Sequence, residues 1–106
     1  MSNNLFDSII LSFKNMPRDV VTVPTTKRDG KWFYVSSDGT KVYVQSGKHH
    51  KNASVIKGVR MLNPSKTEQM LSFYHRRKNG ESVSAEAQAY TVNQAYWYGI
   101  FAELGL

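Results

Sequence analysis

Two adjacent histidines stand between two lysines in a polar stretch of the chain. The segment Lys48-His49-His50-Lys51 follows Gly47, and residues 46–52 are expected to form a loop. Imidazole exchanges protons near neutral pH and lysine attracts phosphate, so such a group can act as acid and base toward a phosphodiester. This interpretation predicts a small metal-independent ribonuclease that uses His49 or His50. The alternative, which we favour, is that both are surface side chains of a glycine-containing loop.

The sequence offers little for other kinds of catalysis. A metal site needs three or four converging ligands, and the three histidines show neither His-x-x-x-His nor Glu-x-x-His spacing. The absence of cysteine excludes a thiolate zinc site, a cysteine nucleophile and a disulfide framework. A serine nucleophile needs a histidine base with an orienting acid, and residues 46–52 contain no acid. We therefore expect no catalytic residue, no metal and no cofactor, and a protein that is not an enzyme.

Positive charge is concentrated in the first three quarters of the chain. The 106 residues hold 14 Lys and Arg against 8 Asp and Glu, for a net charge of +6, and all 14 bases fall in residues 1–78. Between Asp38 and Glu68 there is no acid. Such a distribution favours anionic partners, although it is also typical of a surface that only keeps the protein soluble. The expected phosphate contacts are Lys41, Lys48, Lys51, Lys57, Arg60, Arg76, Arg77 and Lys78.

The segment from Lys31 to Ser46 predicts a β-hairpin. Two β-rich runs flank Asp38-Gly39, and a two-residue turn there pairs Val35 with Val42. One face of the hairpin then carries an apolar set fit for a core, Phe33, Val35, Val42 and Val44, and the other carries Trp32, Tyr34, Tyr43, Lys41 and Gln45. Aromatic rings beside cations are typical of sheets on which the bases of a single strand stack. The alternative is that a helix covers these rings as part of the core.

Apolar spacing and capping signals predict the remaining elements. We expect a helix over residues 4–15 and a short edge strand at 20–23, ended by Pro24. A further strand over 54–62, bulged by Gly58, precedes a helix over 65–78 that Ser65 and Glu68 would cap. Residues 84–104 are helical, and their pattern leaves open whether they form one helix or two.

The last helix has two further interpretations. As the recognition helix of a helix-turn-helix it fails, because it contains no Lys or Arg for base contacts. Its aromatic residues would either pack against the sheet and the first helix or form a homodimer interface, and its acidic end would leave the basic regions free. The aromatic and apolar residues concerned are Tyr90, Tyr96, Trp97, Tyr98, Ile100, Phe101 and Leu104.

These observations predict a single α+β domain over residues 1–106. It has an N-terminal helix, an antiparallel sheet of three to four strands and two to three C-terminal helices. The first residues lack a basic leader and no apolar run is long enough for a membrane span, so we expect a cytoplasmic protein without membrane contact.

The function that this composition favours is non-enzymatic binding of DNA or RNA. Phosphates would lie against the basic loop, including His49 and His50, and against the helix end at 76–78, while bases stack on Trp32, Tyr34 and Tyr43. The alternatives are a protein-interaction or regulatory module that docks on an acidic protein, and the ribonuclease described above.

Overall fold

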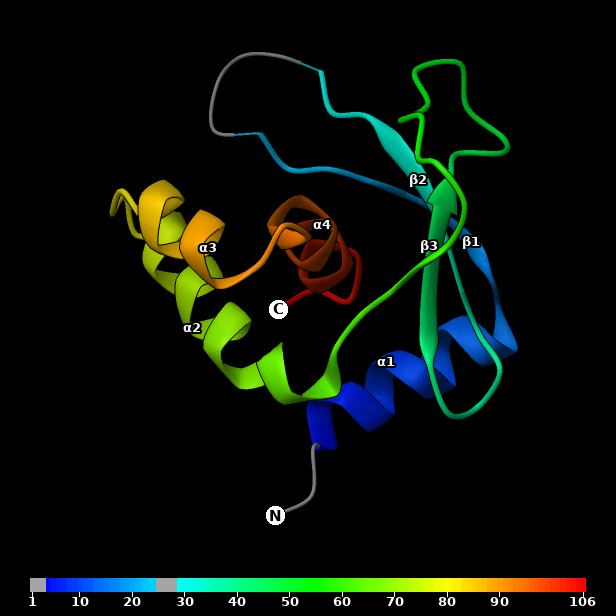
Figure 1. Ribbon diagram of the computed structural model, residues 1–106, viewed down its shortest axis with the longest axis horizontal. Helices are drawn as coiled ribbons and strands as arrows, with labels where there is room; N and C mark the ends of the chain where they lie inside the picture. The colour runs from blue at the N-terminus through cyan, green and yellow to red at the C-terminus, as the bar shows by residue number, and fades with distance from the viewer. Residues whose placement is uncertain (1–3, 25–28) are drawn as a thin grey trace.

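A computed structural model describes residues 4–24 and 29–106 of the chain. The first helix is followed by a four-stranded antiparallel sheet in the order β1-β2-β3-β4 and then by three α-helices (Figure 1), which confirms the predicted α+β class. The elements are α1 (Asn4–Asn15), β1 (Arg18–Val21), β2 (Trp32–Ser37), β3 (Val42–Ser46), β4 (Arg60–Met61), a 3-10 turn (Pro64–Lys66), α2 (Thr67–Lys78), α3 (Ser84–Tyr90) and α4 (Gln94–Glu103). No helix within the described residues is long and apolar enough to cross a membrane.

The hairpin forms, but its predicted pairing is wrong by two positions. Val35 pairs with Val44 instead of Val42, because four residues, 38–41, connect the strands. The carboxylate of Asp38 accepts hydrogen bonds from the backbone N–H groups of Thr40 and Lys41, both at 2.8 Å, and so closes a longer loop than the two-residue turn. Gly39 adopts φ +96°, a conformation that glycine accepts without a steric cost.

The even shift in register leaves each side chain on its predicted face. Side chains alternate along a strand, so only an odd shift would exchange the two faces of the sheet. The apolar set, Phe33, Val35, Val42 and Val44, is fully buried on what we call the inner face. Trp32, Tyr34 and Tyr43 are partly buried on the opposite side, the outer face.

Three other local predictions need correction. The edge strand β1 begins at Arg18 and ends at Val21, two residues earlier than expected. Most of segment 54–62 is irregular: only residues 60–61 form a strand, and Gly58 stands in a turn with φ +67° instead of a bulge. Before this segment, Ala53 forms an isolated parallel bridge with Trp32, the first residue of β2.

The helices begin slightly differently from the capping predictions. Asn63, not Ser65, caps the 3-10 turn before α2, and its side-chain oxygen accepts a hydrogen bond from the backbone N–H of Ser65. Residues 84–104 form two helices, α3 and α4, which are separated at residues 91–93. The predicted stop after α2 is confirmed, since Gly80 has φ +93°.

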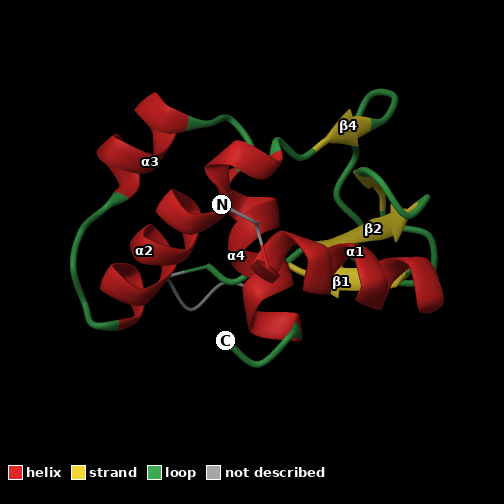
Figure 2. Cartoon of the chain, turned by 90° about the horizontal axis from the view of Figure 1, so that it is seen from below, coloured by secondary structure: helices red, strands yellow, loops and turns green. Residues whose placement is uncertain are grey.

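Helix α4 is the centre of the core. It lies between the sheet and helices α2 and α3 in both ribbon views, while α1 packs directly on the sheet (Figures 1 and 2). Trp97, Ile100 and Phe101 are almost wholly buried and pack inside the chain itself, whereas Tyr90, Tyr96 and Leu104 of the same predicted set are partly buried. A methyl group on Gly99 would come within 2.8 Å of the carbonyl oxygen of Val21, so this close approach of α4 to β1 depends on glycine.

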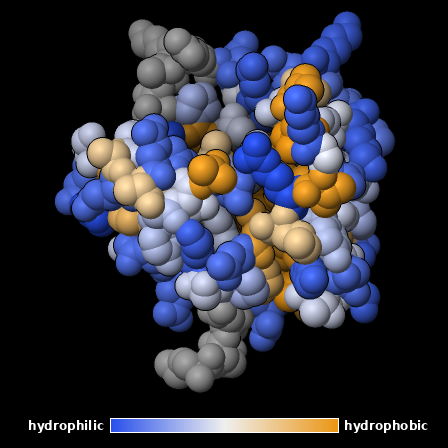
Figure 3. All heavy atoms as spheres, in the orientation of Figure 1, coloured by the Kyte–Doolittle hydropathy of each residue, from blue (hydrophilic) through white to orange (hydrophobic). Residues whose placement is uncertain are grey.

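In the orientation of Figure 1, hydrophilic residues predominate around the rim of the molecule (Figure 3). On the face viewed in Figure 1, hydrophobic atoms gather along the boundary between the helices and the sheet (Figure 3). The exposed large apolar side chains include Val55, Val59, Met61 and Val92.

Candidate functional site

The loop that contains the two histidines is held by the buried carboxylate of Asp19 and, at its end, by Asn52. The side chain of Asn52 donates to the carbonyl oxygen of Gly30, and its backbone carbonyl accepts from the N–H of Trp32. Asp19 stands in β1 opposite Tyr34, on the outer face of the sheet, yet its side chain is only 1% exposed. It accepts hydrogen bonds from the backbone N–H groups of Lys48, at 3.0 and 3.2 Å, and of His49, at 2.7 Å. Because a buried carboxylate needs such donors, residues 47–52, which we call the histidine loop, are fixed over the outer face.

The same carboxylate orients one of the histidines. Nδ1 of His50 lies 2.9 Å from an oxygen of Asp19. An ionised carboxylate can only accept, so Nδ1 carries the proton of this hydrogen bond and Nε2 is the ring nitrogen available to a ligand or a proton. The His50 side chain is 41% exposed. The structure thus supplies the acid that the loop sequence lacks, from a strand that lies 31 residues earlier in the chain.

The surroundings of Asp19 keep it ionised. Burial by itself raises the pKa of a carboxyl group, but the hydrogen bond from His50 and those from the backbone of Lys48 and His49 outweigh it, and the pKa of Asp19 is lowered. The carboxylate therefore remains a full negative charge at neutral pH beneath a cationic loop.

Side chains of the histidine loop lie on the rings of the outer face. The imidazole of His50 stacks on Trp32, with ring centroids 3.5 Å apart and planes 6° from parallel. Nζ of Lys48 lies 4.1 Å from the centroid of the Tyr34 ring, and the His49 ring meets that ring edge-on at 6.1 Å. The predicted stacking surface is thus partly occupied by the chain's own loop, and its outermost ring is that of His50.

Tyr43 lies farther along the outer face, at the hairpin loop. Its hydroxyl donates to the carboxylate of Asp38 at 2.7 Å. Three donors lower the pKa of Asp38 to about 2: first the backbone N–H of Lys41, then the Tyr43 hydroxyl and the N–H of Thr40. The hydrogen bond to Asp38 also raises the pKa of Tyr43. The loop that displaces the predicted register therefore also orients a predicted binding residue.

The predicted basic residues fall into two groups. Lys41, Lys48, Lys51 and Lys57 are exposed in or near the strands and the histidine loop. The run at the end of α2 lies on the opposite side of the molecule in both ribbon views.

The second group is already engaged within the chain. The guanidinium of Arg76 forms ion pairs with Glu81 and Glu86, both at 2.8 Å. Arg77 donates to the carbonyl oxygen of Val23, and Lys78 to that of Leu106. Arg60, in β4 and outside both groups, is also engaged: it donates to the side-chain oxygen of Asn93 at 3.2 Å and lies over the ring of Tyr96. The structure does not bring these residues together with the histidine loop.

The described residues contain no group of three or more histidine, aspartate or glutamate side chains placed to hold a metal ion. Comparisons of the chain with protein-family models, with curated proteins and with solved structures found no match. The case for a function therefore depends on this chain's own geometry.

Asp19 is the residue that sequence reasoning missed. The predicted strand began one residue after it, which left an acid next to Val20 outside any element. Aspartate is disfavoured in strands. An aspartate bordering a β-branched run is therefore a position to examine for a buried partner, and this was the signal available.

Proposed function

We propose that the protein binds single-stranded nucleic acid on the outer face of its sheet, with the histidine loop as the main contact. The observation that carries the proposal is the anchoring of this loop by Asp19. A loop that is already ordered loses little conformational entropy when a ligand binds. Less of the attraction between its lysines and phosphate is then offset by that loss, and the affinity is higher. In this proposal Lys48 and Lys51 contact phosphates, with Lys41 and Lys57 at the edges.

In this proposal a base stacks on the imidazole of His50 and not directly on Trp32. The ring of Trp32 is covered by His50, but the side chain of His50 is 41% exposed. A base that stacks on this imidazole extends the Trp32–His50 stack by one ring, and Tyr43 offers a second ring at the other end of the face. The arginines of α2 have a minor role here, since ion pairs and carbonyl groups already engage them.

Fluorescence anisotropy with labelled single- and double-stranded RNA and DNA across a salt series tests the proposal. If four lysines neutralise phosphates on a single strand, the log–log slope of affinity against salt is about −3. The double variant Lys48→Gln/Lys51→Gln should reduce that slope by about 1.4. The matched control is Lys14→Gln, which removes an exposed lysine from α1 and should leave the slope unchanged. Absence of binding to all four nucleic acids at low salt would favour an acidic protein as the partner.

A second candidate function is metal-independent cleavage of RNA, which the hydrogen bond between Asp19 and His50 favours. In such a reaction Nε2 of His50 would take the proton of the attacking 2′-hydroxyl as the new O–P bond forms. The bond from phosphorus to the 5′-oxygen would break as His49 gives that oxygen a proton. We expect no cleavage, because the imidazole of His50 is stacked on Trp32 and its carboxylate partner serves mainly to hold the loop. Turnover in the presence of a chelator that disappears in His50→Ala would show the opposite.

A further inference from the structure

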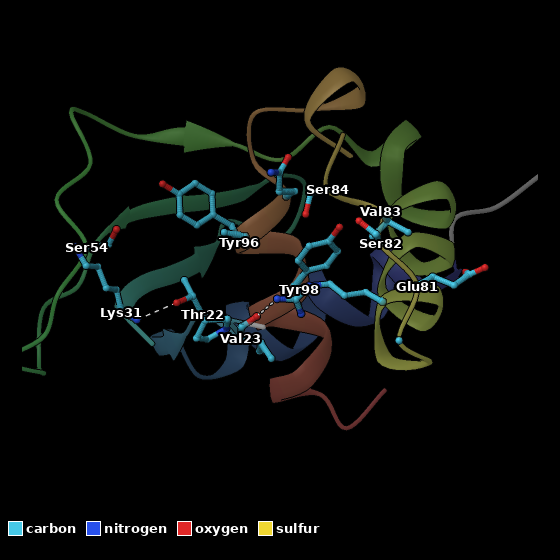
Figure 4. A pocket seen from close by; sticks show the side chains of 15 residues that line it. Thr22, Val23, Lys31, Ser54, Glu81, Ser82, Val83, Ser84, Tyr96 and Tyr98 are labelled. Carbon is cyan, nitrogen blue, oxygen red and sulfur yellow. Dashed lines mark hydrogen bonds between the residues drawn. The ribbon is translucent and has the colours of Figure 1, made fainter. Parts of the chain in front are cut away.

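A cavity of about 860 Å³ opens on the side of the molecule where the helices meet the ends of β1 and β2. Its wall includes Thr22, Val23 and Lys31 from the sheet side, Ser82–Ser84 before and at the start of α3, and Tyr96 and Tyr98 from α4 (Figure 4). This volume lies within the range of small-molecule sites. No residue of the histidine loop lines the cavity, although Ser54, two residues after that loop, does.

Two buried polar atoms of this wall have no hydrogen-bond partner among the described residues. They are the hydroxyl oxygen of Tyr98, a residue only 5% exposed, and the side-chain oxygen Oε1 of Gln94. Figure 4 shows Tyr98 reaching from α4 toward the segment 82–84. Buried polar groups are nearly always satisfied. Both atoms are closed to solvent, so each side chain has to turn toward the cavity before a ligand there can pair with it.

The charges around the cavity select the sign of that ligand. Arg77 and Lys31 line it, and the guanidinium of Arg77 lies 4.7 Å from the centroid of the Tyr98 ring. Arg77 donates to the carbonyl oxygen of Val23, which leaves further N–H donors of its guanidinium for an anion. The acidic residue in the wall, Glu81, shares Arg76 with Glu86, so one negative charge of this group remains against the two cations Arg77 and Lys31.

The two unpartnered atoms select the rest of the ligand. Oε1 of Gln94 can only accept a hydrogen bond, so the ligand must carry an N–H or O–H donor, whereas the Tyr98 hydroxyl can donate or accept. The partly buried ring of Tyr96 offers a flat apolar surface beside them. We propose that this cavity binds a small organic anion with donors on a planar body, the chemistry of a nucleoside monophosphate. The proposal does not rest on nucleic-acid binding by the histidine loop.

Isothermal titration calorimetry of the full chain with the four ribonucleoside monophosphates tests this proposal. We expect saturable one-to-one binding of at least one of them, with weaker binding of the matching nucleoside and of inorganic phosphate alone. Tyr98→Phe should weaken the nucleotide about three- to tenfold, because one hydrogen bond to the ligand is lost. Lys31→Gln should also weaken it, and Lys14→Gln, which removes the same charge outside the cavity, should not.

The unliganded variants separate a binding role from a structural one. Since the Tyr98 hydroxyl has no partner within the described chain, Tyr98→Phe should leave the melting temperature of the free protein unchanged or higher. A lower melting temperature with unchanged nucleotide affinity would overturn the proposal, as would the absence of binding by all four nucleotides at millimolar concentration. That result would leave a cavity filled by water alone.

Two further experiments identify the source of the nucleotide and test whether the cavity and the histidine loop are different sites. If the natural ligand is the end of a strand, a 5′-phosphorylated oligonucleotide will show the same dependence on Tyr98 as the free nucleotide. If it is a free nucleotide, only the mononucleotide will. The variant Lys48→Gln/Lys51→Gln should bind mononucleotides as the wild type does. Loss of mononucleotide binding in that variant would place the ligand on the histidine loop and contradict the cavity assignment.

Discussion

The two faces of the central hairpin are built from alternating residues of the same strands, yet they are stabilised differently. The inner face buries Phe33 and Val35 completely against α1 and α4. On the outer face, side chains of the histidine loop cover Trp32 and Tyr34, and hydrogen bonds of Asp19 and Asn52 hold this loop in place. Burial of apolar area stabilises the first, whereas directed hydrogen bonds stabilise the second. Hence we expect truncation of an inner-face side chain to cost more stability than truncation of an outer-face one.

Truncation of neighbouring side chains on opposite faces gives the largest expected contrast. Phe33→Ala should lower the free energy of unfolding by about 3–5 kcal/mol, as a deletion from a fully buried site. Tyr34→Ala removes a partly buried ring and its contact with Lys48, and should cost about 1 kcal/mol. Urea denaturation of both variants measures the difference. Equal losses would mean that the outer face is packed as a second core.

Removal of the anchoring charge should have an intermediate effect on stability. In Asp19→Asn an amide N–H₂ replaces one oxygen that accepts from the loop, so some donors of Lys48, His49 or His50 lose their acceptor. We expect a loss of about 2–3 kcal/mol. The exposed Asp29→Asn is the matched control and should be nearly neutral.

The same variant tests whether the anchored loop matters for binding. A released loop must be ordered again by the ligand, so affinity for a single strand should fall while the salt slope is retained, because no lysine has been removed. If Asp19→Asn binds as tightly as the wild type, the order of the loop has no bearing on function.

Acid titration of stability offers a smaller measure of the same anchor. The pKa of Asp19 is lowered in the folded chain, so the unfolded chain binds its proton more readily. The stabilisation is therefore complete above the unfolded value near 3.8 and is lost as the pH falls below it toward the lower folded pKa. Denaturation midpoints measured between pH 6 and pH 3 should fall more steeply for the wild type than for Asp19→Asn. Parallel curves would show that the carboxylate is not the group that titrates.

The parts of the structure that the sequence predicted are those governed by local periodicity. Helix α1 has its predicted bounds, and the two faces of the hairpin follow from strand alternation alone. The dipeptide Asp-Gly did not predict the correct hairpin register. The side chain of Asp38 accepts hydrogen bonds from the backbone N–H groups of Thr40 and Lys41 and so stabilises a longer loop. The pairing of Asp19 with His50 joins residues 31 positions apart, and no local pattern reports such a contact.

The cavity was also beyond prediction. Its wall combines residues from the ends of β1 and β2, from α2 and from α4, whose proximity depends on the close packing of α4 at Gly99. The aromatic excess of the last helix indicated burial correctly, but no spacing in that helix identifies Tyr98 as a residue whose hydroxyl has no partner among residues 4–24 and 29–106.

Tyr43→Phe should produce the smallest effect, a change in the pKa of Asp38 in the hairpin loop. The pKa of Asp38, about 2, is lowered first by the backbone N–H of Lys41, next by the Tyr43 hydroxyl and then by the N–H of Thr40. Without the hydroxyl, the pKa should rise but stay below the ordinary value of 3.8, since both backbone donors remain. Titration of the Asp38 carboxyl carbon by NMR, in the wild type and in Tyr43→Phe, measures the change. A return to the ordinary value would show that the four-residue loop opens without Tyr43, so that an outer-face ring maintains the register on which both faces depend.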